Sequence, residues 1–384
     1  MDRVYLDNAA TSYPKAPGVG EAVKRFIDDI GCNIKRGVYK SSLSAEEIVF
    51  DTREQICRLF NFDKAENVIF TQNITQSLNF LMKGFLKRGD HCIVSSMEHN
   101  AVMRPLAQLN AEGVEFSRIQ CDSFGRLNPE DITEQIKSNT KAVIMTHASN
   151  VCGTVLPIYD IGKICKEKGI RFIVDSAQSA GTLELDWKRL NADAIAFTGH
   201  KGLLGPQGIG GFVVSDEMAN EMSPYITGGT GSFSDSEEQP EHLPDKFESG
   251  TSNIPGIFGL NTALKYVFSI ETENIRLNEM KLTGTFISEV SDIKGVMLAG
   301  IKGTTGRTAV VSLDFKDLDN AEIAYILDKE YGIATRCGLH CAPSAHKTLG
   351  TFPQGTVRFS FSHFNTMEEV RYTVDAINRI IKRY

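Results

Sequence analysis

The sequence lacks any apolar run long enough to cross a bilayer, and its opening residues, MDRVYLDNAATSYPK, contain no apolar signal core. It also lacks an excess of positive charge, because 41 lysines and arginines stand against 48 aspartates and glutamates, for a net charge of −7. Nucleic acid and anionic membranes are therefore poor partners for it. We expect a cytoplasmic protein that binds neither membrane nor nucleic acid.

Internal repeats and low-complexity tracts are also missing, and charged residues are interspersed, so disorder is not expected. The eight cysteines are scattered along the chain. Without a signal sequence we interpret them as reduced thiols rather than as a disulfide framework. What is present is 384 residues with 41% hydrophobic content, enough for a large core and more than one domain.

The middle of the chain alternates short apolar segments with helical patterns. The apolar segments predict strands at 68–71, 91–96, 141–147, 172–177, 194–199 and 208–214. The segments between them predict helices at 75–86, 101–111 and 158–168. Alternation of this kind is typical of an α/β fold whose mainly parallel sheet is covered on both faces.

The composition of the ends differs from that of the middle. Residues 1–15 resemble an extended arm, and helical patterns follow at 18–30 and 44–60. After about residue 227 the string TGGTGSFSDSEEQPEHLPD predicts a long loop, and a helix is expected at 255–268. The remainder mixes strands (TAVVSLDF, VRFSF) with helices at 319–330 and 366–382. We predict three parts: an N-terminal arm (1–15), a large domain (16–255) and a small α+β domain (256–384).

Polar residues follow the predicted strands, where a parallel sheet binds its ligands. The first such place is Thr71-Gln72-Asn73-Ile74-Thr75, whose free helix-start amides suit a phosphate, although Thr71 or Asn73 would also serve as an ordinary helix cap. Single residues at later strand ends also have structural explanations. They are His99, Asn150, Asp175 and the Lys201 of Thr198-Gly199-His200-Lys201.

Together these strand-end residues match one cofactor, pyridoxal phosphate. A lysine binds the cofactor covalently, and an acid pairs with its ring nitrogen. A flat side chain covers the ring, and helix-start amides and hydroxyls hold the phosphate. The sequence supplies Lys201, Asp175, His99 and the Thr71–Thr75 segment for these tasks.

The string of motifs resembles the class V aminotransferase superfamily, and within it the cysteine desulfurase and selenocysteine lyase family. The matching strings occur in order along nearly the whole chain: YLDNAAT, TQNITQSLN, SMEHNAV, HASNVCGT, VDSAQSAG, FTGHKGLLGPQGIG, FESGTSN, RCGLHCAP and VRFSFSHFNT. The resemblance implies the aspartate aminotransferase-like fold of pyridoxal-phosphate transferases. That fold has a mainly parallel, seven-stranded large-domain sheet and a smaller C-terminal domain, and it forms homodimers.

The resemblance also implies a role for individual residues. For the cofactor, Lys201 is the attachment site, Asp175 faces the ring nitrogen, Gln178 bonds the ring oxygen and His99 stacks on the ring. The phosphate is held by the amide of Ile74, by Thr75, Thr198 and His200, and by Thr251 reaching across from the second subunit. Arg358 clamps the substrate carboxylate, with Arg336 near it, and Asn150 contacts either that carboxylate or the edge of the ring. Cys341 is the nucleophile that accepts sulfur.

The loop from Arg336 to Cys341 carries two cysteines and a histidine. The spacing Cys337-x3-Cys341 is a poor match to zinc motifs, so no metal is expected. Glycine and proline nearby predict an exposed loop, in which Arg336 and His340 would lower the pKa of a thiol. Cys337 is either a bystander or a disulfide partner of Cys341 under oxidation.

The function implied by the resemblance is conversion of L-cysteine to L-alanine, with a persulfide left on Cys341 for a sulfur-acceptor protein. The nearest alternative is a selenocysteine lyase acting on L-selenocysteine. A class V transaminase, a β-lyase and a non-catalytic pyridoxal-phosphate-binding protein are more distant alternatives. Leu339 stands where better-known desulfurases have a second histidine, and His99 is a single histidine, so the acceptor stays open.

Overall fold

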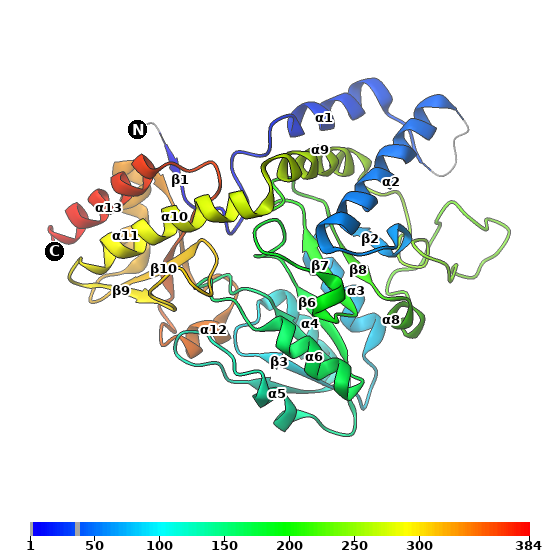
Figure 1. Cartoon of the computed structure of the whole chain (residues 1–384), viewed down its shortest axis with the longest axis horizontal. Helices are drawn as coiled ribbons and strands as arrows, with labels where there is room; N and C mark the ends of the chain where they lie inside the picture. The colour runs from blue at the N-terminus through cyan, green and yellow to red at the C-terminus, as the bar shows by residue number, and fades with distance from the viewer. Residues whose placement is uncertain (1–2, 35–38) are drawn as a thin grey trace.

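The computed structural model describes residues 3–34 and 39–384, which form a large seven-stranded sheet, a small four-stranded sheet and a two-stranded pair (Figure 1). The large sheet has the strand order β2-β8-β7-β6-β5-β3-β4. Its strands are β2 (Val68–Thr71), β3 (His91–Ser95), β4 (Glu115–Ile119), β5 (Thr140–Thr146), β6 (Arg171–Asp175), β7 (Ala194–Thr198) and β8 (Gly210–Val214). Among the described strands of this sheet, β8 alone runs antiparallel to its neighbours. The predicted mainly parallel sheet is confirmed.

Two features of this sheet were not foreseen. Strand β4 lies at the edge, where only Ile119 of its five residues is buried, so its sequence EFSRI lacks the apolar character of the inner strands. Strand β8 follows β7 without an intervening crossover helix and pairs with it antiparallel. A parallel neighbour would have required such a crossover.

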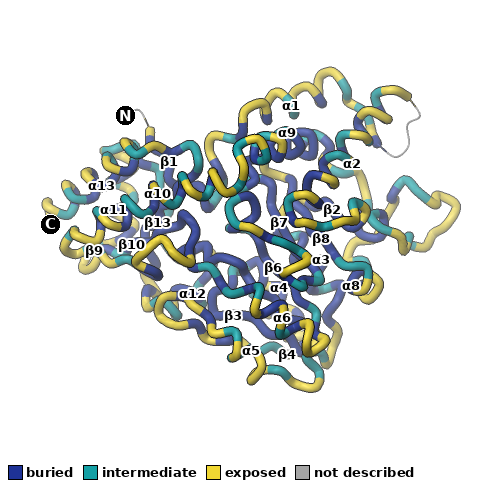
Figure 2. Tube along the Cα trace, viewed as in Figure 1, coloured by how far each residue is buried: buried dark blue, intermediate teal, exposed yellow. Residues whose placement is uncertain are grey.

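Successive side chains of a strand point to opposite faces of the sheet, and on the large sheet both faces carry apolar side chains. On β5, Val143 and Met145 join one core cluster, whereas Ala142 and Ile144 join the other. One cluster is covered by α2 (Lys40–Phe60), α6 (Ile158–Lys168) and α9 (Ile254–Ile270). The other is covered by α3 (Ile74–Phe85), α4 (Asn100–Ala111) and α8 (Asp216–Glu221). Apart from the edge strand β4, the strands of this sheet are consequently almost wholly buried (Figure 2).

Shorter helical segments complete this half of the molecule. The helix expected at 18–30 is α1 (Val19–Arg25) followed by a π-helical segment, Phe26–Ile30. A 3₁₀ turn, Ala65–Asn67, precedes β2, and the helices α5 (Glu130–Gln135) and α7 (Trp187–Leu190) lie in the strand connections. Helix α9 packs against α1 and α2 (Figure 1).

The small sheet is antiparallel, with the order β12-β13-β10-β9. Its strands are β9 (Val296–Ala299), β10 (Val310–Phe315), β12 (Arg336–Gly338) and β13 (Thr356–Ser360). Its helices are α10 (Thr272–Ser291), α11 (Asn320–Tyr331), α12 (Pro343–Thr348) and α13 (Met367–Ile381). Helix α10 follows α9 almost directly and leads from the large sheet to the small one (Figure 1).

The N-terminal arm lies with the small sheet, although it opens the chain. Strand β1 (Val4–Tyr5) pairs in parallel with β11 (Ile333–Ala334), and Val4 and Leu6 belong to the same core cluster as α10 and α13. Both ends of the described chain therefore lie on one side (Figure 1). The division at residues 255 and 256 stays a prediction. Among the described helices, none has the length and apolar character needed to cross a membrane.

Candidate active site

A cavity of about 210 Å³ lies where the C-terminal ends of the large-sheet strands meet the small sheet. Residues from both sheets and from the N-terminal arm line it. The predicted site residues in its wall are Ile74, Thr75, His99, Asn150, Asp175, Gln178, His200, Lys201, Arg336 and Arg358. The fold thus brings together residues that are far apart in the sequence.

One end of the cavity offers hydrogen-bonding groups that lack partners. Helix α3 begins there with Ile74, and the Asn73 side chain caps it by accepting from the Gln76 amide at 3.0 Å. The predicted capping role of Asn73 is therefore confirmed. His200, which lines the cavity, and Thr198, which does not, each have a buried polar atom with no partner among the described residues: Nδ1 of His200 and the hydroxyl of Thr198. Buried polar atoms of this kind are normally satisfied, so these two are available to bond a polar ligand.

Asp175 lies at the end of β6 and is almost completely buried. Its carboxylate accepts from the Ala177 amide at 2.9 Å. Burial raises its pKa, and the nearby Lys201 opposes that shift. A buried carboxylate with so few hydrogen bonds and charges to stabilise it is suited to pair with a positively charged group in the cavity.

His99 begins helix α4 and presents a neutral ring to the cavity. Its Nδ1 accepts from the Ala101 amide at 3.0 Å, so the ring proton resides on Nε2. Burial, followed by the positive charges of Lys201 and Arg336, lowers the pKa of His99 to about 4. At neutral pH the side chain is an uncharged flat ring, as required for stacking on an aromatic ligand.

Lys201 has the reactivity expected of a covalent attachment site. Burial lowers its pKa to about 8, with the like charges of Arg358 and Arg336 acting in the same direction, while Asp175 and Asp7 oppose them. A lysine with a lowered pKa has a substantial fraction of free amine near neutral pH. That fraction supports nucleophilic attack and proton abstraction.

Arg336 and Arg358 are directly paired across strands β12 and β13, and both line the cavity. Like charges opposite each other in a sheet repel. Arg358 is 1% exposed; its Nη1 donates to the Asn150 carbonyl at 3.0 Å and its Nη2 to the Asp7 carboxylate at 2.8 Å. Its Nε is buried without a partner among the described residues. Paired cations with a free donor make an anion site.

Cys341 is exposed beside this arginine pair, and Arg336 Nη2 lies 3.8 Å from its Sγ. Two contacts fix the loop: the Asn100 amide donates to the Cys341 carbonyl at 2.8 Å, and Asn150 Nδ2 donates to the His340 carbonyl at 2.7 Å. His340 and Cys341 both have positive φ, 47° and 57°, a strained conformation that such contacts must maintain. The predicted exposed loop is found only in part: Cys337 and Cys341 are exposed, but Arg336–Gly338 form strand β12 and His340 is buried.

The prediction that His340 helps to lower a thiol pKa is wrong. Its ring is buried, and burial together with the charge of Arg358 drives the pKa of His340 far below neutrality. A neutral imidazole adds no positive charge at the thiol. Arg336 is the cation that contacts Cys341.

The other cysteines divide into two kinds. Burial raises the pKa of Cys92, Cys121 and Cys165 to about 12, so these thiols are poor nucleophiles. Cys337 is exposed, like Cys341. Because it follows Arg336 directly on β12, its side chain leaves the opposite face of the strand from the cavity.

Thr251 is exposed and does not line this cavity. It borders a separate hollow of about 200 Å³ with Thr71, Gln72 and Gln76. Within one chain Thr251 therefore does not meet the other predicted phosphate ligands. A role in the site of a second subunit stays a prediction.

Two acidic residues of the site were missed from the sequence. Glu98 is fully buried, and both of its oxygens accept from the Thr146 amide at 3.0 Å; burial raises its pKa to about 8. Asp7 pairs with Arg358. The available signals were an acid immediately after a buried strand, for Glu98, and an acid within the YLDNAAT string, for Asp7.

Comparison with known proteins agrees with this geometry. The model of the class V aminotransferase family matches residues 4–373. A probable cysteine desulfurase from Methanothermobacter thermautotrophicus is 34% identical, over 99% of this chain and 95% of the relative. The apo structure of a cysteine desulfurase from Thermococcus onnurineus NA1 has a TM-score of 0.93 at 33% identity and covers 100% of this chain and 95% of that one. A cysteine desulfurase structure from Escherichia coli has a TM-score of 0.88 at 27% identity, with the same coverage.

Proposed function

The chain belongs to the class V aminotransferase family, and from that premise we propose that it is a cysteine desulfurase. It converts L-cysteine to L-alanine and retains the sulfur on Cys341. The observation that carries the proposal is the exposed Cys341 beside the Arg336–Arg358 pair, at a cavity that contains a lysine with a lowered pKa. A transaminase or β-lyase has no need of this cysteine.

Pyridoxal phosphate is the cofactor of this family, and the cavity residues fit it. The unpartnered Thr198 hydroxyl and His200 Nδ1, together with the start of helix α3, supply donors for a phosphate. The buried Asp175 carboxylate suits a protonated ring nitrogen, and the neutral His99 suits a ring face. When bound, the cofactor withdraws electrons from the substrate Cα and stabilises the charge that develops there.

The protein's own residues bind and orient the substrate. The free Nε of Arg358, with its neighbouring Nη2, receives the carboxylate in a fork. The Lys201 amine, which attaches the cofactor between turnovers, removes the proton from the substrate Cα at its Nζ. The pKa of Lys201, lowered to about 8, makes the free amine accessible near neutral pH.

Sulfur transfer then takes place at Cys341. Its thiolate attacks the substrate sulfur, so that an S–S bond forms as the carbon–sulfur bond breaks. The electron pair of the broken bond stays with the carbon fragment, which takes up a proton at Cβ, receives a proton back at Cα from Lys201 Nζ and leaves as alanine. Arg336, whose Nη2 lies 3.8 Å from the Cys341 sulfur, places a positive charge beside the attacking group. The sulfur remains on Cys341 as a persulfide for an acceptor protein.

We further propose that the protein works as a homodimer. The exposed Thr251, outside its own chain's cavity, supports a contribution to the phosphate site of a second subunit. Mixed dimers of Lys201→Ala subunits and Thr251→Ala subunits test this, because one of the two sites would then be intact. Recovery of activity on mixing is the expected result, and a fully active monomer would contradict it.

The desulfurase activity is tested by measuring alanine release from L-cysteine and from L-selenocysteine side by side, with the persulfide located by mass spectrometry. We expect one alanine for each sulfur transferred from cysteine and a persulfide on Cys341. Alanine with no protein persulfide would indicate a β-lyase. Release from selenocysteine alone would indicate a selenocysteine lyase, and a purified protein without visible cofactor absorbance would indicate a non-catalytic protein.

A further inference from the structure

We propose that Asp7, on the N-terminal arm, is a positioning residue that holds Arg358 in the orientation needed to receive the substrate carboxylate. This inference rests on the proposed function, because it assumes an amino-acid substrate. It extends that function by making the arm part of the substrate site. The two residues are 351 positions apart and are joined by a 2.8 Å ion pair.

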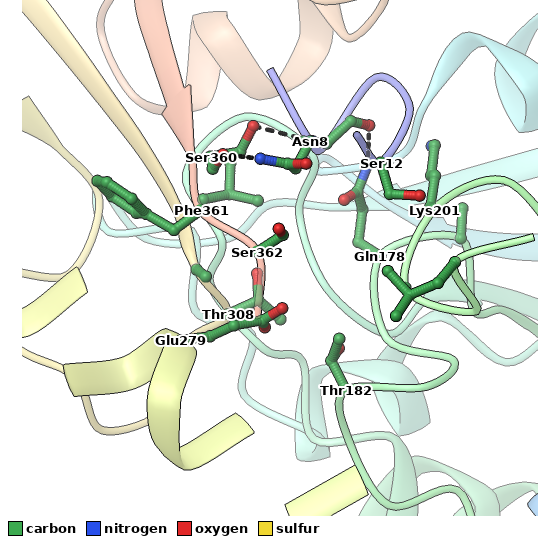
Figure 3. Close-up of a pocket in the computed structure, with 16 residues that line it drawn as sticks. Asn8, Ser12, Gln178, Thr182, Lys201, Glu279, Thr308, Ser360, Phe361 and Ser362 are labelled. Carbon is green, nitrogen blue, oxygen red and sulfur yellow. Dashed lines mark hydrogen bonds between the residues drawn. The ribbon is translucent and has the colours of Figure 1, made fainter. Parts of the chain in front are cut away.

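The arm is firmly attached next to Arg358. The Ser360 amide donates to the Leu6 carbonyl at 2.7 Å, and the Ala9 amide donates to the Ser360 hydroxyl at 2.8 Å. Asn8 Nδ2 donates to the Ser360 carbonyl at 2.9 Å, as Figure 3 shows. The residues before and after Asp7 are therefore bonded to Ser360 of strand β13. Ser360 is two positions after Arg358 in the same strand.

The contacts of the guanidinium group leave one part of it free. Nη1 is held by the Asn150 carbonyl and Nη2 by one oxygen of Asp7, while the buried Nε has no partner among the described residues. Nε and Nη2 form one edge of the planar group, and Nη2 has a second hydrogen. A carboxylate can thus bind along this edge while Asp7 stays in place. If Asp7 were a substitute for the substrate, it would be expected to occupy Nε as well.

The charge balance of the cavity gives the ion pair a second effect. The cationic groups near Arg358 are Arg336, its cross-strand partner, and Lys201; the acidic group paired with it is Asp7. The Cys341 side chain raises the pKa of Arg358. The nearby His340 and His346 are neutral, because burial lowers their pKa values. Without Asp7, Arg358 would be a buried cation repelled by Arg336, and it would be expected to change rotamer.

The same segment of the arm also reaches toward the cofactor side. Gln178 Nε2 donates to the Ala9 carbonyl at 3.0 Å. Figure 3 shows a second, smaller cavity, which Asn8 and Gln178 line together with Lys201. A defect specific to Asp7 must therefore be separated from a general disturbance of the arm.

The test is a titration of the cofactor-loaded enzyme, followed through the cofactor's visible band, with two amines. L-alanine has a carboxylate, and ethylamine is the same molecule without it. In Asp7→Ala we expect the dissociation constant for L-alanine to rise about 10- to 100-fold, as loss of an oriented charge-assisted contact requires, with that for ethylamine unchanged. Asp7→Asn, which keeps a hydrogen-bond acceptor without the charge, should give a smaller rise.

The matched control is Tyr5→Phe, which removes the hydroxyl that donates to the Thr11 carbonyl at 2.9 Å and to the backbone carbonyl of Asp7 at 3.3 Å, but leaves the Asp7 carboxylate on Arg358. It should leave both titrations unchanged. Equal weakening for alanine and ethylamine in the Asp7 variants would overturn the proposal in favour of a structural role, and tighter alanine binding would identify Asp7 as a competitor. Asp7→Asn decides the matter if Asp7→Ala does not fold. Failure of wild type to release alanine from cysteine would contradict the desulfurase function alone, because alanine binding is measured without turnover.

Discussion

The active-site residues of the large and small sheets differ in whether their polar atoms already have hydrogen-bond partners within the protein. At the edge of the large sheet, Thr198 and His200 present buried polar atoms without partners, and His99 is neutral. On the small sheet, Arg358 is already held by Asp7 and Asn150, and the loop of Cys341 is fixed by two hydrogen bonds. Thr198 and His200 of the large-sheet side thus lack partners for these atoms, whereas Arg358 of the small sheet is oriented by two contacts and leaves its Nε unpartnered among the described residues.

This difference matches a resident ligand on one side and a transient one on the other. A cofactor that stays bound can complete the hydrogen bonding of its own site. A substrate that arrives and leaves in every turnover meets groups that are already oriented, which reduces the entropic cost of binding. Changes in the large sheet should therefore alter the cofactor's spectrum, and changes in the small sheet should alter substrate handling while the spectrum persists.

The largest expected effect belongs to the large sheet. Lys201→Ala should lose the visible absorbance of the attached cofactor and lower turnover by at least about 10⁴-fold, because both the covalent link and the base that removes the Cα proton disappear. Absorbance spectra and alanine release measure the two losses. Lys24→Ala, an exposed lysine of α1, should change neither. Near-normal turnover in Lys201→Ala would remove this residue from the mechanism.

Cys341→Ala should separate the role of the large-sheet residues from that of the small-sheet residues. The spectrum of the cofactor should stay normal, while alanine release from cysteine falls by at least about 10²-fold, since the sulfur loses its acceptor. Release from selenocysteine should persist, because selenide leaves more easily than sulfide without nucleophilic help. The readouts are both release rates and the persulfide by mass spectrometry.

Cys337→Ala is the matched control for this experiment, because Cys337 is exposed in the same segment but on the opposite face of β12. It should keep most of the persulfide. A stable persulfide on Cys337 in the wild type would reverse the two roles. Equal loss of both release rates in Cys341→Ala would mean that the thiol donates a proton to the leaving group.

A smaller effect is expected for Arg358→Lys, which keeps the charge but loses the planar fork. Loss of a charge-assisted pair should raise KM for cysteine about 10- to 100-fold with a lesser change in kcat, because the carboxylate is held less well before any bond breaks. Steady-state kinetics measure the split, and the unaltered spectrum is the internal check. An altered cofactor band in this variant would break the proposed separation between the sheets.

The smallest effect concerns stability and pH. Glu279 of α10 is buried, and burial raises its pKa to about 8 from an ordinary 4.5. The folded protein then binds more protons than the unfolded one between these values, so the contribution of Glu279 to stability is complete below pH 4.5 and is lost as pH rises through about 8. Glu279→Gln should therefore raise Tm at pH 9, by roughly a few degrees, and change it little at pH 5.

Thermal unfolding of wild type and Glu279→Gln at the two pH values tests this prediction. Glu273→Gln, an exposed acid on the same helix, is the control and should show no such difference. An equal change at both pH values would show that the amide alters packing rather than ionisation.

Most of the large-sheet site could be predicted because its residues lie in short motifs directly after apolar strands. Lys201, Asp175 and His99 were found in this way, and the cavity contains all three. Helix α10 and strand β4 were missed. The charged face of α10 and the exposed residues of β4 hide their buried sides, which only the neighbouring elements define.

The amino-acid sequence by itself determined the α/β class, the mainly parallel sheet and the residues at its strand ends, because apolar periodicity and local motifs encode contacts that are near in the chain. Only the tertiary structure decided that Arg336 and Arg358 face each other, that His340 is neutral, and that Asp7 holds Arg358. These facts depend on burial and on pairing between segments up to 351 residues apart. Charge and desolvation act through space, so no local pattern along the chain records them.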